Sequence, residues 1–336
     1  MDKRVTLADV VVVIPAYNEG PVIADTVRRA LAVSRQWRVV VIDDGSEDDT
    51  SQQAIQAGAD VIRHPYNRGN GSSVKTAIMN LEQPVVAILD ADGQLPPEAL
   101  PSMIQKMDQA EMVVGARHKD QMGGNWIRGL GNKILCLVAS HISGHTIPDL
   151  TCGLRVFYRE RALEFYHLYP TRFSFPSTST LAFLTCNYRV EFHPIIQKPR
   201  PAGTESKIRE FRDGIRFMAI IFRIVLLFHP WRFFLPLSFF LFLLGLIHEI
   251  VVLFIFGKLV LSGTFTILTM CAFFLFCFGL LSEQVAEMRV HLSHIVHGHS
   301  VNHRSLSFQY LKATMPHGGE PSVLSTRSGP ENDPYN

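Results

Sequence analysis

The sequence predicts an α/β domain with a mostly parallel sheet and helices on both faces, followed by two apolar helices long enough to cross a membrane. Three observations support this fold class. Short apolar runs alternate with helical patterns through the first half of the chain, as in strand–helix–strand units. Three of these runs end in polar, acidic loops. Late in the chain, two apolar stretches of about 20 residues each match the thickness of a bilayer.

Length and composition limit the domains and the partners. A chain of 336 residues accommodates one α/β domain of about 200 to 230 residues and a further unit. A formal net charge of +2 gives no reason to propose nucleic acid as a partner. The five cysteines lack Cys-x-x-Cys spacing, which argues against a disulfide framework or a zinc site. The apolar run of residues 10–14 is too short for a signal peptide, so we expect a cytosolic first domain.

The elements of the first domain are expected in alternation. Apolar, β-branched runs predict strands over residues 10–14, 37–42, 60–63, 85–89 and 112–115. Helical patterns are found over residues 21–32, 72–80 and 97–107, and a further helix should begin near the acids 47–49 and stop at Gly58. Pro21 favours a helix start. A Gly-rich turn, residues 67–71, precedes the helix over residues 72–80.

Asp90 and Asp92 follow the run Val85–Leu89, which is typical of a buried central strand. Ligands of open α/β sheets bind beyond the carboxyl ends of such strands. Mg²⁺ is usually held by one or two carboxylates and the phosphates of a substrate. The pair therefore predicts a metal with a diphosphate. The alternative is a loop whose acids meet water or cap the helix near Pro96.

Two more polar loops belong to the same predicted edge of the sheet. Residues 15–19 follow the first strand and residues 43–46 follow the second. We expect all three loops to converge on one crevice. No Gly-x-Gly-x-x-Gly follows the first strand and no Walker lysine is present, so neither a dinucleotide site nor a P-loop is supported. Asp43 and Asp44 have an alternative reading as a turn and a helix cap.

Taken together, these motifs resemble the family 2 glycosyltransferases of the GT-A fold. The matching segments are Val13–Glu19, Val41–Ser46 and Asp90–Gln94. Between residue 10 and about residue 289 the chain is similar to the polyprenyl-phosphate glycosyltransferases, which include dolichyl-phosphate mannose synthase and the bactoprenol glucosyl transferases. The resemblance implies that Asp90, Asp92 and Gln94 hold Mg²⁺ or Mn²⁺. It implies that the donor nucleotide is held by Pro15, Ala16, Tyr17, Glu19, Asp43, Asp44, Asn67, Gly71 and Asp90.

Arginines recur in the next part of the chain, where guanidinium groups would suit a second phosphate because they bind phosphate bidentately. Any one of them alone would more often be a solvated surface residue. By the resemblance, the acceptor phosphate is held by Arg117, Arg128, Arg155, Arg200, Ser206 and Lys207. Two departures are visible: Cys152 stands where many relatives have Ser, and the gap from Gly203 to Ser206 is one residue longer than in the dolichyl enzymes.

The chemistry of a phosphate acceptor differs from that of a sugar hydroxyl, which needs a general base. A phosphate monoester is mostly dianionic at neutral pH, so it needs positioning and charge neutralisation instead. We therefore expect a single displacement with inversion. The catalytic residues would be Asp92, Arg117 and Arg128, with Asp149 in reserve as a base or as an orienter of an arginine.

The second part of the chain is expected to associate with a membrane. Residues 206–232 show an apolar stripe beside arginines, which predicts an amphipathic interface helix, the alternative being a helix packed on the domain. Residues 235–256 and 264–282 are the predicted spans. Arg223, Arg232 and Arg289 flank the spans while the turn carries only Lys258, so the catalytic domain and both termini should be cytoplasmic.

Two polar features accompany the spans. His248-Glu249 within the first span predicts a contact between helices or protomers rather than a catalytic role, and it makes a homo-oligomer plausible. The histidines of residues 291–303 fit a juxtamembrane helix better than a metal site. The tail from about residue 315 is rich in Pro, Gly and Ser, which predicts disorder.

The predicted domains are residues 1–205, catalytic; 206–232, interface helix; 233–284, transmembrane hairpin; and 285–336, cytoplasmic tail. The predicted function is transfer of one sugar from a nucleotide sugar to a polyprenyl phosphate in the cytoplasmic leaflet, with UDP-hexose as the favoured donor and GDP-mannose as the alternative. The alternatives are a membrane transferase that acts on a hydroxyl, a non-catalytic scaffold of the same fold, and a hydrolase or pyrophosphorylase of nucleotide sugars. A polysaccharide synthase would be expected to carry Gln-x-x-Arg-Trp and more spans.

Overall fold

A computed structural model describes residues 5–117, 126–171, 175–198, 222, 226, 228–256 and 262–299. The side chains of residues 126–130, 142, 256 and 289–299 are outside this description. The predicted interface helix therefore lies almost entirely outside the described residues, as do most of the turn between the apolar helices and the tail after residue 299.

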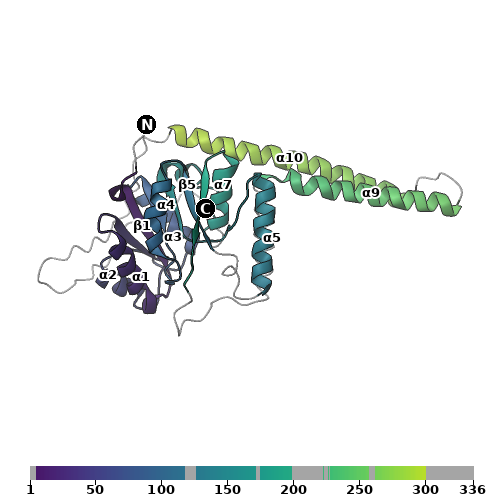
Figure 1. Ribbon diagram of the computed structural model, residues 1–336. Coiled ribbons are helices and arrows are strands. Elements are labelled where there is room, and N and C mark those ends of the chain that lie inside the picture. Colours follow the sequence, from purple (N-terminus) through teal and green to yellow (C-terminus); the bar gives the residue numbers. More distant parts are fainter. Residues whose placement is uncertain are drawn as a thin grey trace, which may run out of the picture.

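A seven-stranded mixed sheet forms the centre of the first domain, in the order β3-β2-β1-β4-β6-β5-β7 (Figure 1). All neighbours pair in parallel except β6, which is antiparallel to both β4 and β5. The mostly parallel sheet is as predicted, whereas β6 and β7 were not indicated by the sequence pattern. The strands are β1 (Val10–Ala16), β2 (Arg38–Asp43), β3 (Asp60–Arg63), β4 (Val85–Ile88), β5 (Met112–Arg117), β6 (Arg155–Tyr158) and β7 (Val190–Ile195).

Helices cover both faces of the sheet. The predicted helix over residues 97–107 is divided into a 3₁₀ turn, η2 (Pro97–Ala99), and α4 (Leu100–Lys106). A second 3₁₀ turn, η1 (Leu7–Asp9), precedes β1. The remaining helices of this domain are α1 (Gly20–Val33), α2 (Thr50–Gln56), α3 (Asn70–Asn80), α5 (Trp126–Ser143), α6 (Arg159–Glu164) and α7 (Phe175–Thr185).

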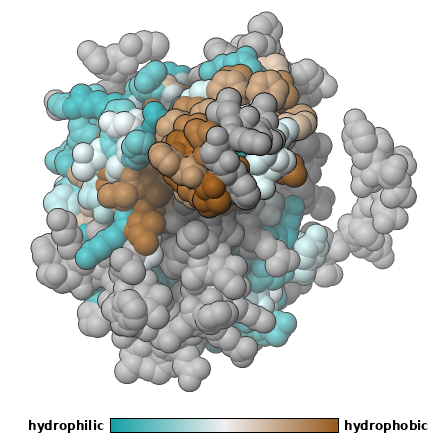
Figure 2. Space-filling view, turned by 90° about the vertical axis from the view of Figure 1, so that its right-hand side faces the viewer, coloured by the Kyte–Doolittle hydropathy of each residue, from teal (hydrophilic) through white to brown (hydrophobic). Residues whose placement is uncertain are grey.

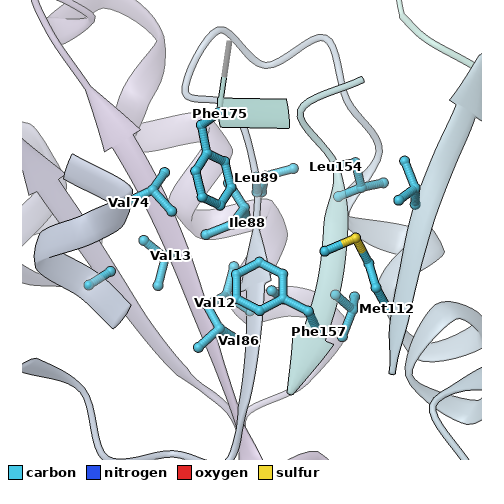
Figure 3. Packing of buried hydrophobic residues seen from close by; sticks show 14 of the residues in the cluster. Val12, Val13, Val74, Val86, Ile88, Leu89, Met112, Leu154, Phe157 and Phe175 are labelled. Carbon is cyan, nitrogen blue, oxygen red and sulfur yellow. The ribbon is translucent and has the colours of Figure 1, made fainter. Parts of the chain in front are cut away.

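The core is centred on β1 and β4, whose residues are all buried. Continuous apolar runs of this kind suit strands with both faces covered. Figure 3 shows Phe157 of β6 beside Val12 and Val86, with Phe175 of α7 above them. The two phenyl rings lie 6.4 Å apart between their centroids. This packing fixes the carboxyl ends of β1, β2 and β4 along one edge of the sheet.

The reversed direction of β6 brings an extra loop to that edge. Its first residue, Arg155, is in register with Ile88 of β4 and Val114 of β5, close to the carboxyl ends of both strands. The residues that precede Arg155 therefore continue beyond the ends of β4 and β5. This places residues 149–154 beside the loop that follows β4.

Two long helices, α9 (Trp231–Phe256) and α10 (Gly263–His299), pack against each other and extend away from the first domain (Figure 1). Residues 231–255 and 263–288 are long and apolar enough to span a membrane, and only 11% of each apolar window is buried. The predicted spans fall almost entirely within these helices. The last part of α10 runs back along the first domain (Figure 1).

Each helix of this hairpin begins at an acid of the other helix. Glu283 of α10 accepts a hydrogen bond from the Trp231 amide at 2.9 Å and lies 3.3 Å from His229 Nδ1. At the far end, Glu249 of α9 accepts from the hydroxyl and the amide of Ser262 at 2.7 and 3.2 Å. Glu249 therefore joins the two helices of one chain, which agrees with the predicted helix contact.

Candidate active site

The loop of residues 90–94, which follows β4, is fixed from two sides. From α1, Thr26 Oγ1 and Arg29 Nη1 donate hydrogen bonds to carbonyl oxygens of the loop at 3.1 and 3.0 Å. From the segment after β7, the Lys198 amide donates to the Gln94 carbonyl at 2.8 Å, and Gln197 Nε2 donates to Gln94 Oε1 at 2.5 Å. The loop is thus held in place by elements distant in sequence.

Asp90 is the residue of this loop whose carboxyl group has a strongly raised pKa. Burial and the neighbouring Asp92 raise its pKa to about 6, although the positive charges of Arg117 and Arg155 oppose this rise. A carboxylate in such a place is stabilised by a cation, and two carboxylates with an amide oxygen form the hard donor set that Mg²⁺ and Mn²⁺ prefer. The described residues hold no cluster of three or more His, Cys, Asp or Glu. The residues present therefore fit a metal that takes its other ligands from substrate and water.

Gly153 closes the loop before β6 onto Asp90. A Cβ atom added at Gly153 would lie 2.1 Å from Asp90 Oδ2 and 2.3 Å from Oδ1. Real Cβ atoms do not approach oxygen so closely. The backbone can reach the Asp90 carboxylate only because this residue has no side chain.

Arg117, at the end of β5, forms a bidentate ion pair with Asp149. Arg117 Nε donates to Asp149 Oδ2 at 2.7 Å and Nη2 donates to Oδ1 at 3.0 Å, while Nη2 also reaches Thr151 Oγ1 at 2.7 Å. Asp149 is fully buried, and the Arg117 side chain is 17% exposed. Burial alone would lower the pKa of Arg117, but its hydrogen bonds to Asp149 raise the pKa. Of the two roles predicted for Asp149, this geometry supports the orienter of an arginine.

Arg155 does not fit its predicted contact with the acceptor phosphate. Its side chain is fully buried, and burial lowers its pKa to about 10. Arg155 Nη1 donates to the Pro176 carbonyl at 2.8 Å and to Ser179 Oγ at 2.7 Å, and Nη2 donates to the Cys152 carbonyl. The guanidinium is therefore enclosed by protein groups and joins α7 to the loop that precedes β6.

The other predicted acceptor residues are not placed by their side chains. Arg128 lies in the first turn of α5, where only the backbone is described. Arg200, Ser206 and Lys207 lie outside the described residues. Cys152, by contrast, is buried beside Arg117 and Asp149, and burial raises the pKa of its thiol to about 12. A thiol of this kind is neutral and has a packing role.

The loops after β1 and β2 converge as predicted. The Asn18 amide donates to Ser46 Oγ at 2.9 Å, and the Glu47 amide donates to Asn18 Oδ1 at 2.9 Å. Tyr17 and Glu19 remain partly exposed on the first loop, and Pro15 and Ala16 are buried at its start. Glu19 is also close enough to Asp90 to contribute to its raised pKa. The first loop therefore borders both the predicted nucleotide site and the predicted metal site.

Asp43 and Asp44 are both buried and shape the loops around them. Asp43 accepts from the Ser46 amide at 2.9 Å, as the turn reading requires. Asp44 accepts from the amides of Arg68 and Gly69 at 3.0 and 2.7 Å. It also lies 2.7 Å from His64 Nδ1. These bonds fix the turn before α3, where Asn67 is exposed.

Gly71, a predicted donor-binding residue, lies against the segment that follows α6. A Cβ added there would lie 2.0 Å from the Pro170 carbonyl oxygen, so this face of Gly71 is occupied by backbone. The next residue, Ser72, donates its amide to the Thr171 carbonyl at 2.6 Å. Gly71 therefore allows α3 to approach the segment after α6.

Four residues that support the site were not indicated by sequence reasoning: Arg29, His64, Asn132 and Gln197. His64 bridges Asp44 and Thr76, with its Nε2 2.9 Å from Thr76 Oγ1. Asn132 accepts from Thr151 Oγ1 at 3.1 Å. His64 stands three residues before Asn67, Gln197 three before Arg200 and Asn132 four after Arg128, but none of the three belongs to a motif itself. All four are brought to the site by tertiary contacts that leave no local pattern.

Comparison with known proteins agrees with this geometry. Residues 11–164 match the family model for Glycosyl transferase family 2, and residues 229–288 match the GtrB C-terminal hairpin. Residues 11–164 thus form a family 2 glycosyltransferase domain. The hairpin match covers α9 and the apolar part of α10, so both units of the chain have counterparts in known families.

Two curated relatives of the glycosyltransferase are undecaprenyl-phosphate 4-deoxy-4-formamido-L-arabinose transferases. The protein from Edwardsiella ictaluri is 28% identical over 201 residues, which cover 57% of this chain and 56% of the relative. The protein from Salmonella choleraesuis is 29% identical over 226 residues, which cover 62% and 63%. The matched stretch thus spans less than two thirds of these relatives.

Solved structures share the GT-A fold. Glucosyl-3-phosphoglycerate synthase from Mycobacterium tuberculosis, in complex with phosphoglyceric acid, has a TM-score of 0.51 at 17% identity, over 64% of this glycosyltransferase and 78% of that chain. The same synthase in complex with Mn²⁺ and UDP-glucose has a TM-score of 0.52 at 17% identity, over 64% and 77%.

Proposed function

We propose that this glycosyltransferase moves one sugar from a nucleotide-sugar donor to a polyprenyl phosphate, giving a polyprenyl-phosphate sugar and a nucleoside diphosphate. The observation that carries the proposal is the buried Arg117–Asp149 pair beside Asp90, in a chain with an apolar hairpin. The guanidinium of Arg117, held in one orientation next to the proposed metal ligand Asp90, suits an anionic acceptor. The undecaprenyl-phosphate transferases among the relatives support the same acceptor class.

The donor would be bound at the edge formed by the loops after β1, β2 and β4. Asp90, Asp92 and Gln94 would hold Mg²⁺ or Mn²⁺, which would neutralise charge on the diphosphate leaving group. UDP-hexose is the favoured donor and GDP-mannose the alternative. The synthase complex with Mn²⁺ and UDP-glucose, which has the same fold, supports this choice.

The acceptor phosphate would be held by Arg117, together with Arg128 and the predicted element that contains Arg200, Ser206 and Lys207. One phosphate oxygen attacks the anomeric carbon from the face opposite the diphosphate. The new carbon–oxygen bond forms as the bond to the diphosphate breaks, and the configuration inverts. Because the acceptor is already anionic, no general base is required. Asp149 stays paired and keeps Arg117 aimed at the site.

We place the reaction in the cytoplasmic leaflet. The basic residues that flank the hairpin support cytoplasmic flanks, since lysine and arginine are enriched on that side. The catalytic domain would then face the pool of nucleotide sugars.

The proposal is tested by transfer of labelled sugar into an organic-extractable lipid. Detergent-purified protein receives UDP- and GDP-sugars in turn, with undecaprenyl phosphate and Mg²⁺ or Mn²⁺. We expect one donor to label the lipid, and we expect Asp92→Ala or EDTA to abolish labelling. The exposed acid Glu82 provides the matched control, Glu82→Ala.

Other results would favour the alternatives. Label on a hydroxyl acceptor would indicate a different membrane transferase. Free sugar or sugar phosphate released without lipid would indicate a hydrolase or pyrophosphorylase. Nucleotide binding without any transfer would indicate a scaffold.

A further inference from the structure

Gln94, the last residue of the loop after β4, is held by two consecutive residues of the segment that follows β7. The Lys198 amide donates to its backbone carbonyl at 2.8 Å, and Gln197 Nε2 donates to its side-chain oxygen Oε1 at 2.5 Å. Within the loop, the Gln94 amide donates to Asp92 Oδ1 at 3.1 Å. The backbone and the side chain of this predicted metal ligand are therefore both fixed by protein contacts.

The course of β7 brings Gln197 to this loop. Its last residue, Ile195, is in register with Arg117 at the end of β5, so residues 196–198 continue at the edge of the sheet where the site lies. Ile195 is buried, Ile196 is exposed and Gln197 is again partly buried. Alternate side chains of a strand point the same way. The inward direction of Gln197 thus follows from the alternation along β7.

A chain of charged groups joins the same segment to the loop a second time. Lys198 Nζ lies 3.8 Å from Glu98 Oε1, and Glu98 Oε2 lies 3.2 Å from Arg29 Nη2. Arg29 Nη1 in turn donates to the Gly93 carbonyl at 3.0 Å. The side chains of Glu98 and Lys198 are more than half exposed, so these ion pairs add little stability. The direct bonds from Gln197 and Lys198 are therefore the main link between the segment and the loop.

The two ends of a glutamine amide differ as metal ligands. Mg²⁺ and Mn²⁺ bind the oxygen, whereas the NH₂ group offers only donors. Rotation of the amide by half a turn would exchange the two ends. With its own Nε2 facing Gln94, Gln197 opposes this rotation, because two NH₂ groups cannot donate to each other. An amide oxygen has two lone pairs, so the bond from Gln197 leaves one for a metal.

We infer that Gln197 is a positioning residue that turns the amide oxygen of Gln94 towards a metal held by Asp90 and Asp92. The inference rests on the proposed function, of which the metal site is a part. It adds a residue that lies 103 positions beyond Gln94 in the chain and belongs to none of the predicted motifs. Partners of this kind orient a metal ligand without touching the metal, and their loss weakens metal binding by about 10- to 100-fold.

The inference is tested by titration of Mn²⁺ into the purified full-length protein, with free Mn²⁺ measured by electron paramagnetic resonance. The hairpin presents hydrophobic surface, brown in Figure 2, so the protein is kept in detergent. Gln197→Met preserves the length of the side chain but removes the donor, and we expect it to weaken Mn²⁺ binding by about 10- to 100-fold. Gln105→Met is the matched control, because Gln105 is exposed on α4, beside the segment before β1. Its Mn²⁺ affinity should equal that of the unsubstituted protein.

A second background separates orientation of the amide from support of the loop. Gln94→Glu replaces the amide by a carboxylate, whose two ends are both oxygen, so its rotation no longer matters. Addition of Gln197→Met to Gln94→Glu should then change the Mn²⁺ affinity by no more than about twofold, as for sites that do not interact. An equal loss in both backgrounds would mean that Gln197 merely supports the loop, and would overturn the inference. Unchanged affinity in Gln197→Met alone would overturn it too.

The affinities also keep the inference apart from the proposed function, because none of them requires sugar transfer. If the unsubstituted protein bound Mn²⁺ but labelled no lipid with any donor, the proposed transfer would fail and the inference would stand on the affinities alone. If the unsubstituted protein bound no Mn²⁺, the proposed metal site and the inference would both fail.

Discussion

Asp149 illustrates how one buried carboxylate determines what a neighbouring arginine can do. Both of its oxygens accept hydrogen bonds from Arg117, and Oδ1 also accepts from the Thr151 amide at 3.0 Å. A carboxylate engaged in this way holds the guanidinium in one orientation and has little freedom to remove a proton. The arginine is thus preorganised for an anion.

Asp149→Asn should therefore reduce both stability and acceptor binding. Loss of one partner of a buried ion pair costs about 3 to 5 kcal/mol, so the thermal midpoint should fall and the KM for the lipid acceptor should rise. The exposed Asp25 offers the control Asp25→Asn. A fall in kcat alone, with stability and KM unchanged, would instead identify Asp149 as a general base.

Gly153→Ala should disturb the metal site. The added methyl group would displace the Asp90 carboxylate, so we expect weaker Mn²⁺ binding, measured by electron paramagnetic resonance, and loss of transfer. Gly263→Ala is the control, because a Cβ at Gly263 meets nothing within 4 Å. Normal Mn²⁺ affinity in Gly153→Ala would show that Asp90 is not a metal ligand.

His64→Leu should weaken donor binding without altering the acceptor KM. The substitution removes the imidazole from Asp44, which keeps its two amide donors, and a lost hydrogen bond to a charged group costs about 1.5 to 3 kcal/mol. The turn before α3 should loosen as a result. Titration with the active nucleotide sugar measures the effect. An unchanged dissociation constant would mean that the turn before α3 does not contribute to donor binding.

At the scale of whole elements, most of the sheet could be predicted because its strands are buried. β1 and β4 require continuous apolar runs, and such runs are visible in the sequence. β6 escaped detection because it begins with an arginine and runs directly into α6, so no polar turn marks its end. Arg155 was expected to hold the acceptor phosphate. Its burial could not be predicted, because the carbonyl and hydroxyl groups that accept its hydrogen bonds come from α7, which is distant in sequence.

The site could also be predicted only in part: its motif residues were predicted, but their supporting contacts were not. Asp90 and Asp92 follow a recognisable strand, so their position at the sheet edge could be derived from sequence. The contacts of Asn132 and Gln197 could not, because they depend on how α5 and β7 pack. Sequence reasoning therefore locates the loops that hold the donor better than the contacts that hold those loops.

The reciprocal caps of α9 and α10 should stabilise the hairpin as a unit. A cap of this kind contributes about 1 kcal/mol, so Glu249→Ala and Glu283→Ala should each lower the thermal midpoint in detergent. Because the two acids make their contacts at opposite ends of the hairpin, their effects should add. Glu287→Ala, at an exposed acid of α10, is the control. If neither variant changes the thermal midpoint, the two caps do not stabilise the hairpin.

For the molecule as a whole, the basic flanks of the hairpin predict its orientation. Lys258→Cys and Asn336→Cys, each introduced alone in the background without Cys186, Cys271 and Cys277, report on the two sides. In intact cells, a membrane-impermeant maleimide should label position 258 and should label position 336 only after permeabilisation. The opposite pattern would place the catalytic domain outside the cytoplasm.

The reciprocal caps have a mechanical consequence. Because each helix start is joined to the other helix, α9 and α10 cannot slide past one another to shorten. The 25 residues of the first candidate span are about 37 Å long, which exceeds a hydrocarbon core of about 30 Å. A hairpin that spans such a bilayer would tilt or locally thicken it, and the bond from Arg232 to His141 would pass a tilt on to α5. In that case a change in bilayer thickness would be transmitted through α5 to Arg117 and Asp149.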